Sequence, residues 1–406
     1  MRIHRNQSRN IFRRRNSFNG CLSWFVTLGL VGVFIFFGRE QIQSWFFSWY
    51  YPSPDVASIQ DTQTAFRNGN LDRTIDYAQR LYESDHSQIE ALELLVRSLI
   101  YRSYADINQD ADRVRALDIT TAAIARHPND LRVLAIHAFA LQANDLSNDA
   151  QRIALRVIRN DENNIAARLA LSLSYASQGI FEAGLRDSLR AVDIANTVHT
   201  DWRADAYRVL AITHSDLGQY SDAADAVETA ISYHRRLLPL HFERALYAQQ
   251  TGDMDTATAY YFNVIAFDEN NIKARFRLCE VSSMLGERDA AIDWCSQVTE
   301  LAPGWAEGWY WLGREYYLDG DWGNTQSTLN RCSTLQVAQG IPIEERRLEC
   351  WFIQGQAAEV LGDCEPLIAL YNEYQQMART ASLTQSWVYP DDIPPICTTP
   401  TPFPDG

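Results

Sequence analysis

The feature that most constrains this chain is a turn that recurs about every 34 residues. A Gly or Asp interrupts a helix-like apolar pattern at six places, which are Asp145, Gly179, Gly218, Gly252, Gly286 and Gly320. Four of the five intervals between them are 34 residues long, and one is 39. The phrase DENNI occurs at the same phase of two units, beginning at Asp161 and at Asp268. A fixed period of this length indicates a repeat array, in which each unit buries its apolar face against its neighbours.

Each unit predicts a pair of amphipathic helices. In residues 308–335, one apolar pattern at helical spacing is followed by a Gly-Asp break and then by a second pattern. Small residues recur where the two helices must approach closely, because a larger side chain would separate them. In the first helix these are Ala138, Ser172, Ala211, Ala245, Cys279 and Gly313, and in the second Ala150, Gly184, Ala223, Ala257 and Ala291. We therefore predict an all-α fold, an α–α superhelix of about nine helix pairs over residues 55–380.

The repeat resembles the tetratricopeptide repeat (TPR) family. The pattern of that family is W-x2-L-G-x2-Y, then A-x3-F, then P. The first part is matched by Trp309, Leu312, Gly313 and Tyr316. Other units match at Ala257 with Tyr261, at Ala291 with Pro303, and, after an eight-residue insertion, at Trp351 with Gly355. The resemblance implies a superhelix whose first helices line a concave groove that binds proteins or peptides.

On the family's phase, several aromatic and cationic side chains project into that groove. The predicted partner-binding residues are Phe242, Phe276, Tyr310, Arg314 and Tyr317. Aromatic and arginine side chains carry much of the binding energy of protein interfaces, so these residues suit a protein or peptide ligand. The alternative is that the aromatic side chains pack between neighbouring helices.

The N-terminal segments predict a membrane anchor. Residues 1–20 hold six arginines and no acidic residue, and residues 21–38 hold no charge. As a helix, 21–38 would span roughly 27 Å, close to the ~30 Å hydrocarbon core of a bilayer. The aromatic segment 39–54 suits the membrane interface. We expect a single-pass membrane protein with a cytoplasmic N-terminus and an extracytoplasmic repeat domain; a cleaved signal peptide is the alternative.

Six of the seven cysteines lie in the last third of the chain. An even number in an oxidising compartment permits disulfides. In the family's phase, Cys279 and Cys295 face each other within one unit, and Cys332 and Cys350 flank the insertion. We expect at least one bridge, with these two pairs as equal candidates, and Cys364 with Cys397 could tie the C-terminal tail to the last repeat. Buried free thiols are the alternative.

No catalytic or cofactor motif stands out in the sequence. It has no G-x-S-x-G, no H-E-x-x-H, no C-x-x-C and no Gly-rich phosphate loop, and Lys273 is its only lysine. The formal net charge of −15 argues against nucleic-acid binding. We therefore expect a protein that is not an enzyme and needs no cofactor or metal.

The sequence thus predicts five regions: a basic arm 1–20, an anchor 21–38, a linker 39–54, a repeat superhelix 55–380 and a Pro-rich disordered tail 381–406. The expected function is that of a membrane-anchored scaffold or adaptor that binds a protein or peptide in its groove. An accessory or regulatory subunit of an envelope enzyme, or of a secretion or glycan assembly complex, is the alternative.

Overall fold

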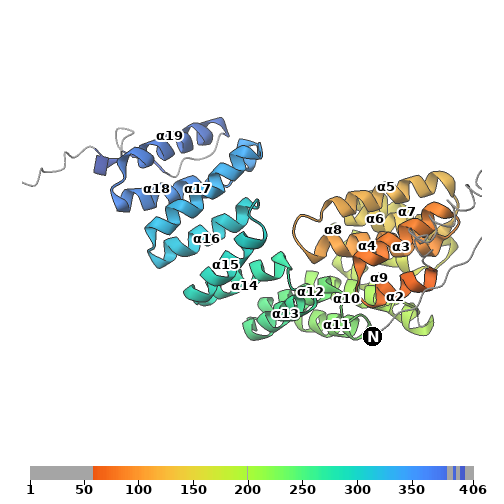
Figure 1. Ribbon diagram of the computed structural model, residues 1–406. Helices are drawn as coiled ribbons and strands as arrows, with labels where there is room; N and C mark the ends of the chain where they lie inside the picture. Colours follow the sequence, from red (N-terminus) through yellow and green to blue (C-terminus); the bar gives the residue numbers. More distant parts are fainter. Residues whose placement is uncertain (1–57, 199, 382–386, 390–393, 398–406) are drawn as a thin grey trace, which may run out of the picture. The chain divides into compact units, whose positions relative to one another are not determined.

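The computed structural model describes residues 58–198, 200–381, 387–389 and 394–397. The only regular secondary structure within these residues is helical. Eighteen α-helices, α2–α19, and two short 3-10 helices follow one another without a β-strand (Figure 1). They form nine consecutive helix pairs, α2 with α3 through α18 with α19. The predicted all-α superhelix of helix pairs is confirmed for this part of the chain.

The helix bounds follow the period seen in the sequence. The first six pairs comprise α2 (Ile59–Arg67), α3 (Leu71–Ser84), α4 (Ile89–Ala105), α5 (Ala111–Arg126), α6 (Leu131–Ala143), α7 (Ser147–Asn160), α8 (Ile165–Ser177), α9 (Phe181–Val198), α10 (Arg203–Asp216), α11 (Tyr220–Tyr233), α12 (Leu238–Gln250) and α13 (Met254–Phe267). The last three comprise α14 (Ile272–Leu285), α15 (Arg288–Leu301), α16 (Ala306–Asp319), α17 (Trp322–Ala338), α18 (Glu349–Leu361) and α19 (Cys364–Thr380).

The recurring turn and the DENNI phrase both have a capping role. Gly286 and Gly320 end α14 and α16 in the left-handed conformation, with φ of 76° and 82°, which glycine adopts without steric cost. Asn164 and Asn271 of the DENNI phrases are the N-caps of α8 and α14, and each side chain accepts a backbone N–H of the first turn. The phrase is repeated because it ends one repeat and begins the next.

Small residues bring paired helices together, as the sequence indicated. A Cβ atom on Gly313 of α16 would lie 2.6 Å from Leu329 Cγ and 3.2 Å from Thr328 Oγ1 of α17. The predicted close approach of the two helices is therefore confirmed at Gly313.

The apolar core is continuous in one part of the chain and divided in the other. One cluster of buried side chains extends from Phe66 on α2 to Tyr247 on α12. From α12 onward the core consists of three smaller clusters, and the smallest contains only Cys279, Cys295 and Leu312 as buried members.

The six cysteines of this region lie in pairs. The Cα atoms of Cys279 and Cys295 are 5.3 Å apart, those of Cys332 and Cys350 6.1 Å, and those of Cys364 and Cys397 5.5 Å. The structure joins each pair as a disulfide, and these separations suit such a bond.

Part of the tail packs on the last repeat. Trp387 is buried and makes edge contacts with Phe352, Tyr371 and Tyr374. A Cβ atom on Gly355 would lie 2.1 Å from its indole ring. Trp387 therefore covers the helix face on which a further repeat would otherwise pack.

The expected membrane localisation is corrected by the structure. None of the helices in the described ranges is both long and apolar enough to cross a membrane. Even α9, which has 18 residues, carries Glu182, Arg186, Asp187, Arg190 and Asp193. The prediction of a single-pass membrane protein with an extracytoplasmic repeat domain is therefore wrong by this criterion. The predicted arm 1–20, anchor 21–38 and linker 39–54 lie outside the described residues.

Candidate partner-binding groove

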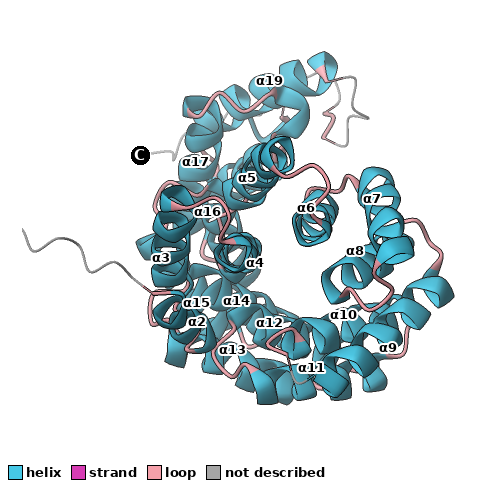
Figure 2. Cartoon of the chain, turned by 90° about the vertical axis from the view of Figure 1, so that its right-hand side faces the viewer, coloured by secondary structure: helices cyan, strands magenta, loops and turns pink. Residues whose placement is uncertain are grey.

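The groove side of the first repeats is partly covered by the chain itself. Helix α4 lies beside α12 (Figure 2). Side-chain contacts also join it to α10 and to the start of α14. We call these interactions the closing contact. It joins Arg97, Tyr101, Tyr104 and Asp106, on α4 or directly after it, to Asp205, Arg208, Asn271 and Lys273.

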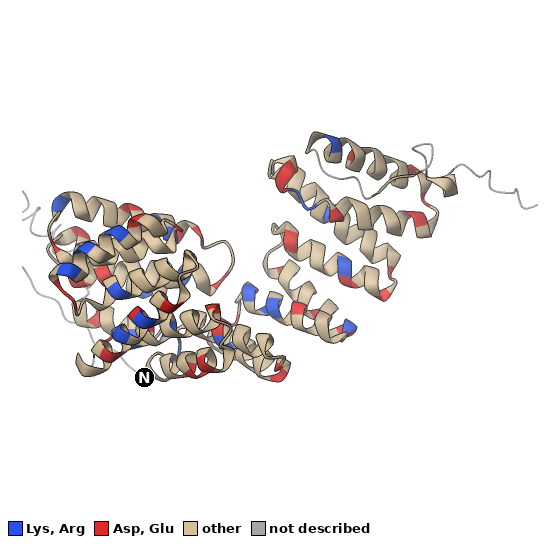
Figure 3. Ribbon diagram, turned by 180° about the vertical axis from the view of Figure 1, so that it is seen from behind, with Lys and Arg blue, Asp and Glu red and all other residues tan. Residues whose placement is uncertain are grey.

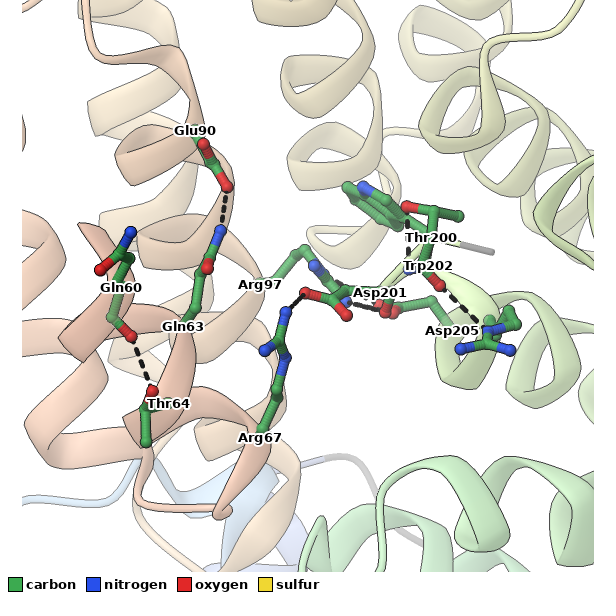
Figure 4. A network of polar contacts seen from close by, with 11 residues as sticks. Gln60, Gln63, Thr64, Arg67, Glu90, Arg97, Thr200, Asp201, Trp202 and Asp205 are labelled. Carbon is green, nitrogen blue, oxygen red and sulfur yellow. Dashed lines mark hydrogen bonds and ion pairs between the residues drawn. The ribbon is translucent and has the colours of Figure 1, made fainter. Parts of the chain in front are cut away.

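The first part of the closing contact is a buried ion pair (Figure 4). Arg97 Nε donates to Asp205 Oδ1 at 3.2 Å, and both side chains are almost fully buried. The guanidinium lies between two aromatic rings, 4.6 Å from the centroid of Phe66 and 4.1 Å from that of Trp202. Tyr101 also donates to Asp205, and burial together with that charge raises the pKa of Tyr101 well above its usual range. Tyr101 therefore remains a neutral donor.

The second part joins the end of α4 to the start of α14. Asp106 accepts the backbone N–H of Lys273 at 2.8 Å, and Asn271 Nδ2 donates to the carbonyl of Ala105 at 3.0 Å. Lys273 Nζ donates to the carbonyl of Tyr104 at 2.6 Å and lies 4.6 Å from the ring centroid of Phe242. Burial lowers the pKa of Lys273 from its ordinary 10.5 to about 8.

These contacts bury Phe242, one of the predicted groove residues. Phe242 is only 8% exposed, because Lys273 covers its ring and Tyr261 packs beside it. Asp205 and Arg208, on the groove side of α10, are likewise occupied by α4. At α10 and α12, the closing contact therefore covers residues that the repeat pattern assigns to the groove.

A different arrangement surrounds Trp311 on α16. Its ring centroid lies 5.7 Å from that of Phe276 and 6.1 Å from that of Tyr310. Phe276 also meets Trp305 edge-on at 5.0 Å. These four rings come from α14, α16 and the residue before α16, so neighbouring repeats meet through aromatic contacts.

Three arginines lie over this aromatic group. Arg277 lies 5.9 Å from the centroid of Phe276, Arg314 5.0 Å from that of Trp311, and Arg347 4.4 Å from that of Tyr310. All three are partly exposed. We call the four rings and these three arginines the aromatic–arginine cluster. Arginines stacked on rings keep N–H donors free at their edges.

Each arginine of the cluster also has a carboxylate partner. Arg277 pairs with Glu280, Arg347 with Glu307, and Arg314 with Glu315. Burial raises the pKa of Glu280, although the charge of Arg277 opposes this. Glu315 is fully buried and also binds Arg288 and the hydroxyl of Ser283, so it keeps two partners if Arg314 turns toward a ligand.

A cavity of about 430 Å³ adjoins the cluster. It lies between the start of α16, the end of α17 and the insertion before α18. It shares Trp305 and Arg347 with the cluster, and Glu307, the ion-pair partner of Arg347, also lines it. Its walls also include Ile341 and Gln336. A cavity with apolar, amide and charged walls of this size suits one or two amino-acid side chains better than an extended apolar ligand.

The five predicted groove residues are therefore not one site. Phe276, Tyr310 and Arg314 all contact Trp311, whereas Phe242 belongs to the closing contact. Tyr317 lies further along α16, where its hydroxyl donates to Gln356 Oε1 at 3.0 Å and its ring meets Trp322. Phe276 is only 9% exposed, so Tyr310 and Arg314 present the accessible part of the cluster.

Sequence reasoning missed Trp311 and the flanking Arg277 and Arg347. Trp311 follows Tyr310 in the run WYW, a local concentration of aromatic residues that was visible in the sequence. Arg347 lies in the insertion, which has no place in the repeat pattern, so only the folded chain brings it to Tyr310.

Metal-binding groups and the distribution of charged residues also bear on the site chemistry of the described ranges. No group of three His, Cys, Asp or Glu residues in the described ranges is placed to hold a metal ion. In the ribbon view of Figure 3, basic and acidic residues are interspersed along the described helices.

Comparisons with known proteins bear on the fold. No family model and no curated protein matches the sequence. Among solved structures, the APC/C hetero-tetramer Cut9–Hcn1 matches with a TM-score of 0.54 and 16% identity, over 73% of this chain and 54% of that chain. The C-terminal part of a TPR repeat-containing protein from Cytophaga hutchinsonii matches with a TM-score of 0.51 and 15% identity, over 61% and 96%. The fold is that of a TPR solenoid.

The matches cover different shares of the solved structures, and their sequence identity to this TPR solenoid is low. It spans about half the length of the matched chain in the Cut9–Hcn1 complex. At 15–16% identity the likeness concerns the path of the helices and not the groove side chains. The likeness therefore shows the fold alone, since one fold can serve many functions.

Proposed function

We propose that this chain is a non-enzymatic scaffold that binds a protein or peptide partner at the aromatic–arginine cluster. The single observation that supports this most is the group of partly exposed arginines stacked on aromatic rings beside a cavity of about 430 Å³. Aromatic and arginine side chains at the centre of an interface commonly dominate its binding energy.

The cluster also indicates the chemistry of the ligand. Arg314 and Arg347 present N–H donors that suit a carboxylate or a backbone carbonyl. The adjoining cavity has room for one aliphatic or aromatic side chain next to Trp305 and Ile341. We therefore propose a peptide segment with an acidic residue close to an apolar one. Tyr317 and the exposed Leu246 are candidates for contacts further along the groove.

The test is a selection of random peptides displayed on phage against the full chain, followed by affinity measurements on synthetic copies. We expect enriched sequences to pair an acidic with an apolar residue. Tyr310→Ala and Arg314→Ala should each weaken their binding by about tenfold, or ~1.4 kcal/mol. The matched control Arg152→Ala, at an exposed arginine on α7, should leave the affinity unchanged. Equal affinity of the selected peptides for all three variants would place the binding site elsewhere.

A further inference from the structure

A second surface on the last three repeats carries exposed apolar side chains in register. Met284, Leu318 and Val360 lie in the last turns of α14, α16 and α18, with exposed fractions of 60%, 48% and 59%. Their intervals of 34 and 42 residues equal one repeat, and one repeat with the eight-residue insertion. The three residues therefore occupy one repeat position. We call them, together with the adjacent Leu285 and Leu361, the apolar edge stripe.

Contacts between the helices show that the stripe is continuous in space. Ser283, next to Met284, bonds to Glu315 of α16 at 2.7 Å. Tyr317, next to Leu318, bonds to Gln356 of α18 at 3.0 Å. Packed helices lie about 8–10 Å apart, so the stripe has one apolar position about every 10 Å.

The stripe is confined to these three repeats. The same position holds Gln250 in the repeat before, Asp216 in the one before that, and Ser177 in the next one back. Since three other repeats have a polar residue at this position, the helix pair does not need an apolar residue there to fold. Contiguous exposed apolar surface commonly marks an interaction site.

Unpaired acidic residues border the stripe. The exposed acidic residues lie at the end of α16 and at the N-caps and first turns of α15 and α19; they are Glu287, Asp289, Asp319, Asp363 and Glu365. None of them forms an ion pair with another described residue, and the one arginine among them, Arg288, is held by Glu315. The local charge is therefore negative and uncompensated, and it complements a basic partner.

We infer that the apolar edge stripe docks a basic amphipathic helix of a partner protein. Seven residues of an α-helix advance about 10.5 Å, which matches the spacing between the helices that carry the stripe. A partner helix with apolar residues at every seventh position would meet all three repeats, and lysines or arginines on either side would face the acidic turns. This docking uses none of the residues of the aromatic–arginine cluster and does not depend on the proposed function.

The test uses the full chain and labelled model peptides of about 18 residues, with leucine at every seventh position and flanking arginines. Fluorescence anisotropy should show binding that weakens as salt is raised. Leu318→Glu should weaken it by about tenfold or more. The matched control is Leu189→Glu, because Leu189 on α9 is 49% exposed, as Leu318 is 48%, and the same charge is introduced. A peptide of identical composition with leucine at every fifth position is the control for spacing.

Three outcomes would overturn the inference. They are no binding by any heptad-spaced peptide, equal weakening in the two glutamate variants, and equal binding of the two leucine spacings. Sedimentation that shows a wild-type dimer and a Leu318→Glu monomer would assign the stripe to a second copy of this chain instead. Tyr310→Ala should bind the peptide as the wild type does, which separates this surface from the aromatic–arginine cluster. Met284→Gln provides a milder variant should Leu318→Glu unfold the repeat.

Discussion

The repeats α2–α13 and α14–α19 share one sequence pattern but use their groove sides differently. In α2–α13, α4 contacts α10 and α12, and the buried side chains of Arg97, Tyr101 and Asp205 occupy that part of the groove side. In α14–α19, Tyr310 and Arg314 are partly exposed, and Arg347, which stacks on Tyr310, lines a cavity. The difference teaches that a groove residue assigned by repeat phase is available to a partner only where no distant helix covers it.

The two parts also differ in what holds them together. The first part has one continuous apolar core. The second has three separate clusters, and the six cysteines of the described residues all lie there. Cys279 and Cys295 form most of the smallest cluster. The disulfides thus lie from α14 onward, where the apolar core is divided into separate clusters.

The largest expected effect breaks the closing contact. Arg97→Ala leaves Asp205 buried without its cation, and this should lower the free energy of unfolding of α2–α13 by about 3–5 kcal/mol. Hydrogen exchange, followed separately in the two parts during urea unfolding, should show the loss in α2–α13. The control is Arg132→Ala, which breaks the more exposed pair with Glu93 and should cost less than about 1 kcal/mol. Similar losses in the two variants would show that the closing contact adds little.

The next effect tests the disulfides of α14–α19. Alkylation without reductant, on protein folded in an oxidising medium, should leave the six cysteines from Cys279 to Cys397 unmodified in mass spectra. Removing the Cys279–Cys295 bridge by a double serine substitution should cost about 3 kcal/mol, since it closes a loop of 16 residues. The loss should appear in α14–α19 and not in α2–α13. Alkylation of all six thiols would contradict the bridges.

A smaller effect tests the packing within one repeat of the second part. Gly313→Leu should overpack the contact with Leu329 and Thr328 and cost about 1–3 kcal/mol. Gly323→Leu is the control, because only Asp321 lies within 4 Å of a Cβ atom there. Thermal unfolding of the two variants gives the comparison, and an unchanged melting temperature in Gly313→Leu would mean that α16 and α17 are not in this register.

The smallest effect per pH unit concerns the pH dependence of the closing contact, in which Lys273 of α14 bonds to the end of α4. Lys273 has a pKa of about 8 in the folded chain, against an ordinary value of 10.5. Between these two pH values, Lys273 is therefore protonated in the unfolded chain and largely deprotonated in the folded chain. Stability should therefore rise with pH in this range, by at most about 1.4 kcal/mol per pH unit. Lys273→Met should lack this rise, and the difference between the two curves removes the contribution of other groups. Parallel curves would show that Lys273 titrates normally.

Much of the fold was readable from the sequence because it depends on local interactions. The turn glycines, the Asn caps and the small residues at helix contacts each act within one repeat, so their spacing predicted the helix pairs and their order. The pairings of Cys279 with Cys295 and of Cys332 with Cys350 were also suggested by phase alone, since each pair lies within about half a repeat of sequence.

The candidate site depended on contacts that no local pattern encodes. The superhelix determines that Arg97 meets Asp205, 108 residues later, and that Lys273 meets Tyr104, 169 residues earlier. Phase alone assigned Phe242 and Tyr310 the same role, yet the closing contact buries the first and leaves the second accessible. The sequence by itself determined the repeat, the helix pair and its caps. The tertiary structure decided which groove residues are covered, because that depends on how the small rotations between successive repeats add up until distant helices meet.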